Sequence, residues 1–238
     1  MMKQRIWELD ALRGICILGV IAVHFIFDIT VLFPFVSWQP PEGFLVFQQW
    51  GGVIFVLLSG VCVTLGSHSV KRGAIVFGCG MVCTAVTAGM YFLNMANKGI
   101  IIYFGALHCL GACMMLWPLF KKQNYISLLS LGAALVAIGF VLAQMRSTTL
   151  WLMPLGLVTA DFATGDYFPL LPHLGFFLAG AALGRILYKD KQSLLPRVNG
   201  DAPILRFLQL CGKHSLWIYL LHQPILNGIC WLLITYVK

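Results

Sequence analysis

Charged residues are scarce in this chain. Asp, Glu, Lys and Arg make up only 10% of its 238 residues, whereas a soluble domain carries about 25%. The scarcity argues against a soluble protein. The helices expected in this chain are also apolar on nearly every face and have no polar side to present to water. No polar stretch is long enough to form a soluble domain, and we expect none. The eight cysteines show no CxxC spacing, so small packing residues are favoured over a metal or redox motif.

The sequence is instead rich in long apolar runs. The chain is 60% hydrophobic, and runs of about 20 apolar residues are long enough to cross a bilayer. We therefore predict an all-α, polytopic integral membrane protein with a single domain over residues 1–238 and about seven transmembrane helices. The predicted spans are 11–33, 49–67, 74–93, 100–119, 125–144, 168–188 and 214–236. Leu150–Leu157 is too short to cross and is predicted to be interfacial or re-entrant, ended by Pro154 and Gly156.

The basic residues predict how the chain is oriented. Most lie at one set of span ends: Lys3, Arg5, Arg13, Lys71, Arg72, Lys121, Lys122, Arg185, Lys189, Lys191, Arg197, Arg206 and Lys213. The opposite loops hold only Lys98, Arg146 and Lys238. Because basic loops stay cytoplasmic, we expect a cytoplasmic N-terminus, an external C-terminus and a location in the cell membrane. The net charge of +8 is then accounted for without a nucleic-acid partner. The first span lacks a small-residue cleavage site, so we do not expect a signal peptide.

Four histidines lie inside or at the mouths of the predicted spans: His24, His108, His173 and His222. An ionisable group in hydrocarbon is costly and is a functional-site hypothesis by default. At a rise of about 1.5 Å per residue, His24 and His108 lie at similar depth in the outer half of the membrane. His173 lies near the external mouth of its span, and His222 lies deeper in the last span.

The first predicted span carries a polar stripe that favours His24 as the catalytic residue. Asp28 follows His24 by four residues and shares its helix face, so its carboxylate could orient the imidazole as a base. His108, at matched depth, completes the predicted catalytic set. The alternatives are a buried His24–Asp28 pair that joins helices, and a packing role for His108 between Gly105 and Gly111.

Several stretches together resemble a known family. These are RIWELDALRGICILGVIAVHFIFD, FVLLSGVCVTLG, YFGALHCLG, DYFPLLPHLGFFLAGAALGRILY and HSLWIYLLHQPIL. They are similar, over the whole length, to the heparan-α-glucosaminide N-acetyltransferase catalytic-domain family in its small bacterial branch. The closing stretch also resembles the acyltransferase-3 group of membrane O-acetylases. In the animal members of the first family, the histidine proposed as catalytic lies in the first external loop, and an asparagine stands where this chain has His24. Residues 29–49 here contain no histidine, so His24 is the natural substitute.

The resemblance implies a multi-pass acyltransferase. Such an enzyme takes acetyl from cytoplasmic acetyl-CoA and delivers it to an acceptor on the far side of the bilayer, classically an amino sugar. The cationic residues expected to bind the CoA phosphates are Arg5, Arg13, Lys71, Arg72, Lys121, Lys122 and Arg185. His108 could donate to the thioester oxygen. The residues expected to bind the acceptor are His173, His222, Gln223 and Asp161.

The acceptor-site residues also have plainer interpretations. His173 follows Pro172 and could simply cap a helix at the interface. His222 or Gln223 could satisfy the Leu220 carbonyl that Pro224 frees from its helix bond. Asp161 could belong to an ordinary solvated loop.

Two rival functions use the same histidines. A haem-binding electron carrier could ligate iron with His24 and His108, and a small-solute transporter could use the histidines as a proton relay. The Gly-rich spans are compatible with packing either within one chain or between the chains of a homo-oligomer.

Overall fold

The computed structural model describes residues 5–237. Lys3 and Lys238, which contribute to the predicted orientation, lie outside the described residues. Within that range the chain forms eight α-helices and short 3₁₀ and π segments, with isolated bridges in place of strands. The predicted all-α class is therefore confirmed. The helices are α1 (Trp7–Phe27), α2 (Glu42–Leu65), α3 (Ser69–Phe92), α4 (Ala106–Phe120), α5 (Tyr125–Ala143), α6 (Leu170–Leu187), α7 (Pro203–Lys213) and α8 (Ser215–Val237).

Six helices among the described residues are long and apolar enough to cross a bilayer, namely α1, α2, α3, α5, α6 and α8. The span predicted at 100–119 corresponds to α4, which has only 15 residues. It is shorter than predicted because a 3₁₀ turn at Lys98–Ile100 and extended backbone occupy the residues before Gly105. The apolar stretch after α5 forms a 3₁₀ helix, Leu150–Leu155, that ends at Gly156 with φ +108°. Glycine adopts this conformation without steric cost. Gly156 is therefore confirmed as the end of that segment, whereas Pro154, which was also predicted to end it, lies inside the helix.

The chain divides into two compact units. Unit 1 contains residues 1–55 and 191–238, and unit 2 contains residues 56–190. The predicted single domain over the whole chain stays a prediction.

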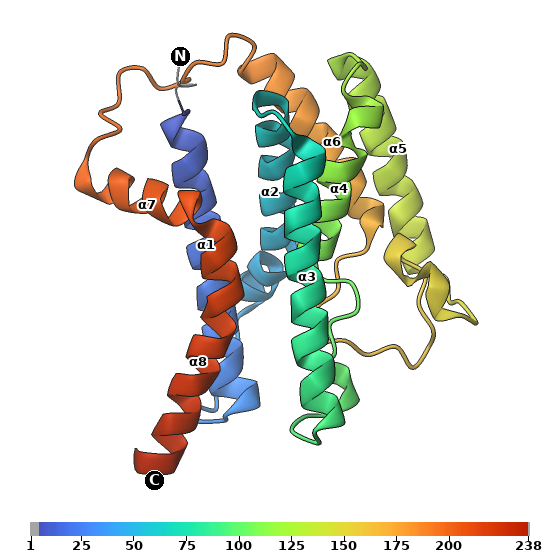
Figure 1. Ribbon diagram of the computed structural model, residues 1–238, viewed down its shortest axis with the longest axis vertical. Helices are drawn as coiled ribbons and strands as arrows, with labels where there is room; N and C mark the ends of the chain where they lie inside the picture. The colour runs from blue at the N-terminus through green and yellow to red at the C-terminus, as the bar shows by residue number, and fades with distance from the viewer. Residues whose placement is uncertain (1–4, 238) are drawn as a thin grey trace. The chain divides into compact units, whose positions relative to one another are not determined.

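Unit 1 contains α1, the start of α2, α7 and α8. In Figure 1, α1 and α8 run in the same direction, and α7 lies across α1. Glycines bring α7 against α1. A side chain at Gly14 would overlap the Leu208 carbonyl, and one at Gly212 would overlap the Asp10 carbonyl. Because α7 precedes α8 in this way, α8 begins part of the way along α1 (Figure 1).

Unit 2 is built from the helix pairs α3–α4 and α5–α6 and from the second half of α2. Small residues again allow backbones to approach closely. A Cβ at Gly73 would lie 2.7 Å from the Gly111 carbonyl, and one at Gly132 would lie 2.8 Å from the Gly175 carbonyl. Gly111 thus allows a close approach of α4 to α3. The core contains fully buried residues of α4, α5 and α6: Cys109, Cys113, Leu128, Phe177, Leu178, Ala181 and Ala182.

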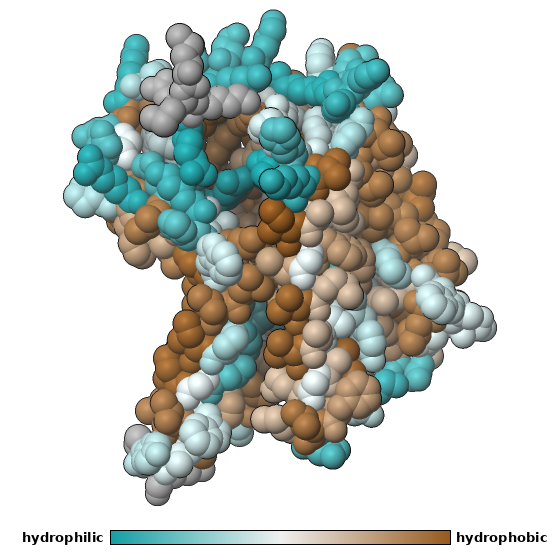
Figure 2. Space-filling view, viewed as in Figure 1, coloured by the Kyte–Doolittle hydropathy of each residue, from teal (hydrophilic) through white to brown (hydrophobic). Residues whose placement is uncertain are grey.

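Apolar residues cover the helices on the outside as well. In Figure 2, hydrophobic residues follow the lengths of the helices and hydrophilic residues gather at their ends. This distribution suits helices whose sides face lipid and whose ends face water.

Candidate functional site

Polar side chains from the two ends of the sequence meet between α1 and α8 in unit 1. The imidazole rings of His24 and His222 lie 4.9 Å apart, centroid to centroid, and are tilted by 60°. Close by, Nε2 of Gln223 donates a hydrogen bond of 2.9 Å to Oδ1 of Asp28. Asn227 lies one turn beyond Gln223 on the same side of α8. We call these five residues, His24, Asp28, His222, Gln223 and Asn227, the α1–α8 cluster.

The sequence predicted that His222 lies deeper in the membrane than His24. In the structure its ring instead lies against that of His24. The depth estimate assumed that the last span starts at the membrane edge. In the structure α7 comes first and α8 begins part of the way along α1, so residues early in α8 reach the level of His24. The difference arises from the helix that precedes α8.

Asp28 stands where α1 ends and a π-helical segment, Asp28–Leu32, begins. Its side chain is fully buried, with 0% exposed. The carboxylate accepts its hydrogen bond from Gln223, and no hydrogen bond joins it to His24 among the described residues. The predicted orientation of His24 by Asp28 is therefore replaced in this structure by a link between α1 and α8. The Gln223 amide donates to one oxygen of the Asp28 carboxylate, and this bond does not hold the imidazole of His24.

The tautomer of His222 follows from its neighbour in α8. Nδ1 lies 2.6 Å from the Tyr219 carbonyl oxygen, which can only accept, so Nδ1 carries the hydrogen. In the neutral ring the lone pair is then on Nε2. This atom is buried and has no hydrogen-bond partner in the described part of the chain. His222 thus bonds a carbonyl of its own helix, as the plainer interpretation expected, but that carbonyl belongs to Tyr219 and not to Leu220.

The α1–α8 cluster is rich in acceptors without donors. Among the residues that the structure describes, Asp28 Oδ2, Gln223 Oε1 and Asn227 Oδ1 are buried without hydrogen-bond partners, like Nε2 of His222. A buried polar atom left unpaired costs about 1–3 kcal/mol, so such a group of atoms favours a molecule that brings hydroxyl or ammonium donors. Sequence reasoning missed Asn227, although an Asn four residues after Gln223 within an apolar helix was a usable signal.

His108 belongs to unit 2 and has a different environment. The Gly105 N–H donates to its Nδ1 at 3.2 Å, so Nε2 carries the hydrogen and donates to the Thr84 hydroxyl at 3.3 Å. That hydroxyl donates in turn to the Ile102 carbonyl at 2.6 Å. Both ring nitrogens are engaged, which fits the packing role left open by the sequence. Since His24 lies in unit 1, the predicted pairing of His24 with His108 stays a prediction.

The other acceptor-site candidates, His173 and Asp161, also lie in unit 2. His173 uses Nδ1 to donate to the Pro169 carbonyl at 2.7 Å. This bond ties the ring to the first turn of α6, but no side chain caps the start of that helix, so the plainer interpretation of a helix cap was wrong. Asp161 is exposed, and a hydrogen bond from the Thr159 hydroxyl lowers the pKa of its carboxyl group. A further loop carboxylate, Asp166, accepts a 2.8 Å hydrogen bond from the Ala106 N–H and so anchors the start of α4.

The predicted phosphate-binding cations fall in both units. In unit 1, the Nε atom of Arg5 and the Nη1 atom of Arg13 lie 3.1 and 3.7 Å from the buried carboxylate of Asp10. The same unit holds a cavity of about 320 Å³ lined by Trp7 and Gln209, among others.

In unit 2, the cations Lys71 and Arg72 lie in the first turn of α3, and Lys121 directly follows α4. Arg185 donates to the carbonyls of Lys121 and Gln123 and lies over the Trp117 ring. Its guanidinium therefore holds the end of α4, a role for which a cation is suited.

The chain was compared with protein families, curated proteins and solved structures. The family model for heparan-alpha-glucosaminide N-acetyltransferase, catalytic, matches residues 5–224. No curated protein and no solved structure shows a significant match. The matched range runs from just before α1 to Pro224 of α8 and includes His24, Asp28, His222 and Gln223. A match over nearly the whole chain shows that this protein belongs to the heparan-alpha-glucosaminide N-acetyltransferase catalytic-domain family.

Proposed function

We propose that this chain moves an acetyl group from cytoplasmic acetyl-CoA to an extracytoplasmic sugar or amino sugar. Membership of the family supports membrane acetyltransferase activity. The observation that carries the more specific proposal is the α1–α8 cluster, in which two histidines in ring contact adjoin four buried acceptor atoms without donors. Sugar hydroxyls and an ammonium group are the donors that such atoms need.

The residues of the cluster can divide the chemistry between them. His24 removes a proton from the acceptor hydroxyl or ammonium, and the freed oxygen or nitrogen bonds to the acetyl carbonyl carbon as the carbon–sulfur bond breaks. The proton passes from the imidazolium to the departing thiolate, so a hydroxyl acceptor yields the acetyl ester and CoA thiol. An ammonium acceptor yields the amide and CoA thiol, and its nitrogen releases a second proton to water. Nε2 of His222 accepts a hydrogen bond from the acceptor, and the Asp28 carboxylate stabilises the transient positive charge. An acetyl-His24 relay is the variant in which His24 attacks first.

The donor is expected to bind through its phosphates at the cytoplasmic helix ends. Arg5 is largely exposed and uses Nε for Asp10, so its terminal nitrogens remain oriented outward for a phosphate. Arg185 is a weaker candidate, because its guanidinium already holds two carbonyls. The predicted role of His108 as donor to the thioester oxygen is tested separately below.

The proposal is tested with the purified protein, radiolabelled acetyl-CoA and glucosamine as the probe acceptor. His24→Ala is expected to reduce acetyl transfer by about 10²-fold or more, the usual contribution of a general base. His214→Ala is the matched control, since His214 is an exposed residue between α7 and α8, and it should retain activity within about twofold. Failure of the wild type to bind acetyl-CoA, or equal activity in His24→Ala, would contradict the proposal.

The same preparation tests the two rival functions. A strong Soret band in the visible spectrum would support a haem protein and argue against the acetyltransferase. Uptake of a solute into vesicles without acetyl-CoA would support the transporter.

A further inference from the structure

Helix α7 carries an apolar strip whose side chains are more than half exposed among the residues that the structure describes. Ile204, Phe207 and Leu210 follow one another at intervals of three residues, and 71%, 54% and 55% of their respective surfaces are exposed. Residues at this spacing lie on neighbouring turns of one side of a helix. With only 11 residues, α7 is too short to cross a bilayer.

The opposite side of α7 is already occupied. Gly212 is buried, and it lies so close to the Asp10 carbonyl of α1 that no side chain would fit. This contact fixes how α7 is rotated about its own axis. The exposed strip is therefore held facing away from α1.

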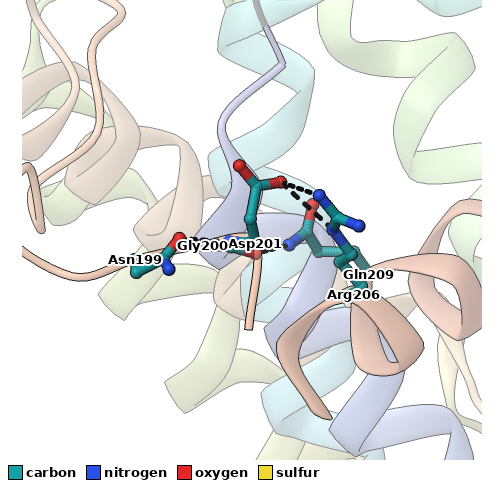
Figure 3. Close-up of polar contacts among 5 residues, drawn as sticks. All are labelled: Asn199, Gly200, Asp201, Arg206 and Gln209. Atoms are coloured by element: carbon teal, nitrogen blue, oxygen red, sulfur yellow. Dashed lines mark hydrogen bonds and ion pairs between the residues drawn. The ribbon is translucent and has the colours of Figure 1, made fainter. Parts of the chain in front are cut away.

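Cations border the strip. In Figure 3, Arg206 of α7 reaches Asp201, with its Nη2 atom 3.2 Å from Oδ1, and Gln209 donates to the Gly200 carbonyl at 2.7 Å. These bonds hold the preceding loop against the polar edge of α7. Lys213 lies seven residues, about two turns, after Arg206, so both cations lie on that edge. Asp201 is the acid that faces Arg206, and it offsets part of this positive charge.

We propose that α7 lies in the bilayer interface and docks on anionic phospholipid, with its apolar strip in the acyl boundary and Arg206 and Lys213 at the phosphate level. An apolar strip beside a basic edge is the pattern of interfacial helices. Helix α8, which begins two residues after α7, also exposes large apolar side chains, among them Trp217 and Leu221, and is long enough to span the membrane. Lipid thus covers both, and the basic edge selects the negatively charged headgroup. This inference does not depend on the acetyltransferase proposal.

The test uses the full-length protein in nanodiscs of phosphatidylglycerol and phosphatidylcholine in equal amounts. The photo-cross-linker p-benzoylphenylalanine is incorporated at position 207, and the lipid adducts are identified by mass spectrometry. We expect adducts at this position, with phosphatidylglycerol enriched about fivefold over phosphatidylcholine, the factor expected when one cation acts near an anionic surface.

The substitutions are made on exposed positions, so the fold is expected to persist, and a thermal melt verifies this. The double variant Arg206→Gln/Lys213→Gln should bring the lipid ratio back to about one while adducts still form. The matched control Lys189→Gln/Lys191→Gln removes the same charge from the exposed preceding loop and should keep the enrichment. Absence of lipid adducts at 207, a wild-type ratio near one, or an unchanged ratio in Arg206→Gln/Lys213→Gln would each overturn the proposal.

Discussion

Gln223 of α8 donates a hydrogen bond of 2.9 Å to the fully buried carboxylate of Asp28 at the end of α1. The two residues are 195 positions apart in the chain, yet this bond is the polar link on which the α1–α8 cluster is built. The bond holds α1 and α8 together, so that His24 and His222 stay at the same level.

Replacing Gln223 should destabilise unit 1. In Gln223→Leu the Asp28 carboxylate loses its donor while remaining buried, which should cost about 1–3 kcal/mol of unfolding free energy. Denaturant unfolding in detergent measures this loss, with Gln192→Leu in an exposed loop as the control. The double variant Asp28→Leu/Gln223→Leu should lose less than the sum of the single variants, because the unpaired carboxylate is gone. Simple additivity would show that the two side chains do not interact.

His108 should be more important for stability than for catalysis. In His108→Ala the Gly105 N–H and the Thr84 hydroxyl lose their partner and a buried ring is removed, so we expect a loss of about 2–4 kcal/mol. Acetyl transfer per folded molecule should stay within about threefold of wild type. If His108 instead donates to the thioester oxygen, transfer should fall by about 10²–10³-fold. Activity normalised to folded protein separates the two roles.

Packing of α7 on α1 should depend on a glycine. Gly212→Ala would place a methyl group against the Asp10 carbonyl, and separating the helices should cost about 1–3 kcal/mol. Gly228→Ala in α8 is the matched control, because a Cβ there meets nothing within 4 Å and alanine favours the helix. Thermal denaturation gives the melting temperatures of the two variants for comparison. Equal melting temperatures would mean that the α1–α7 contact is looser than described.

Tyr167 should make part of the stability depend on alkaline pH. Its hydroxyl donates to the Met153 carbonyl at 2.7 Å, and burial raises the pKa of Tyr167 to about 12, against about 10 in the unfolded chain. The neutral form is favoured by folding, so this contribution is complete below pH 10 and is lost as pH rises from about 10 to 12. The gap in melting temperature between wild type and Tyr167→Phe should therefore shrink across that window. Tyr125→Phe, at an exposed position, is the control.

Much of the candidate site was visible in the sequence, but its arrangement was not. His24, Asp28, His222 and Gln223 were all recognisable as polar residues in apolar runs. The predicted grouping of these residues was wrong, because the depth of each residue was estimated along its own span alone. The amphipathic helix α7, which displaces the start of α8, was not predicted. Asn227 was not predicted, although it lies on the same side of α8 as Gln223.

The sequence by itself determined the all-α class, the apolar helices, the family and the residues that are costly to bury. These follow from local composition and periodicity, since each helix satisfies its own backbone hydrogen bonds. Only the tertiary structure decided that Asp28 bonds Gln223, that His222 contacts His24 and that both nitrogens of His108 are engaged. Those choices depend on how helices are placed against one another. Glycines far from the histidines, such as Gly14 and Gly212, control that placement by letting the backbones touch.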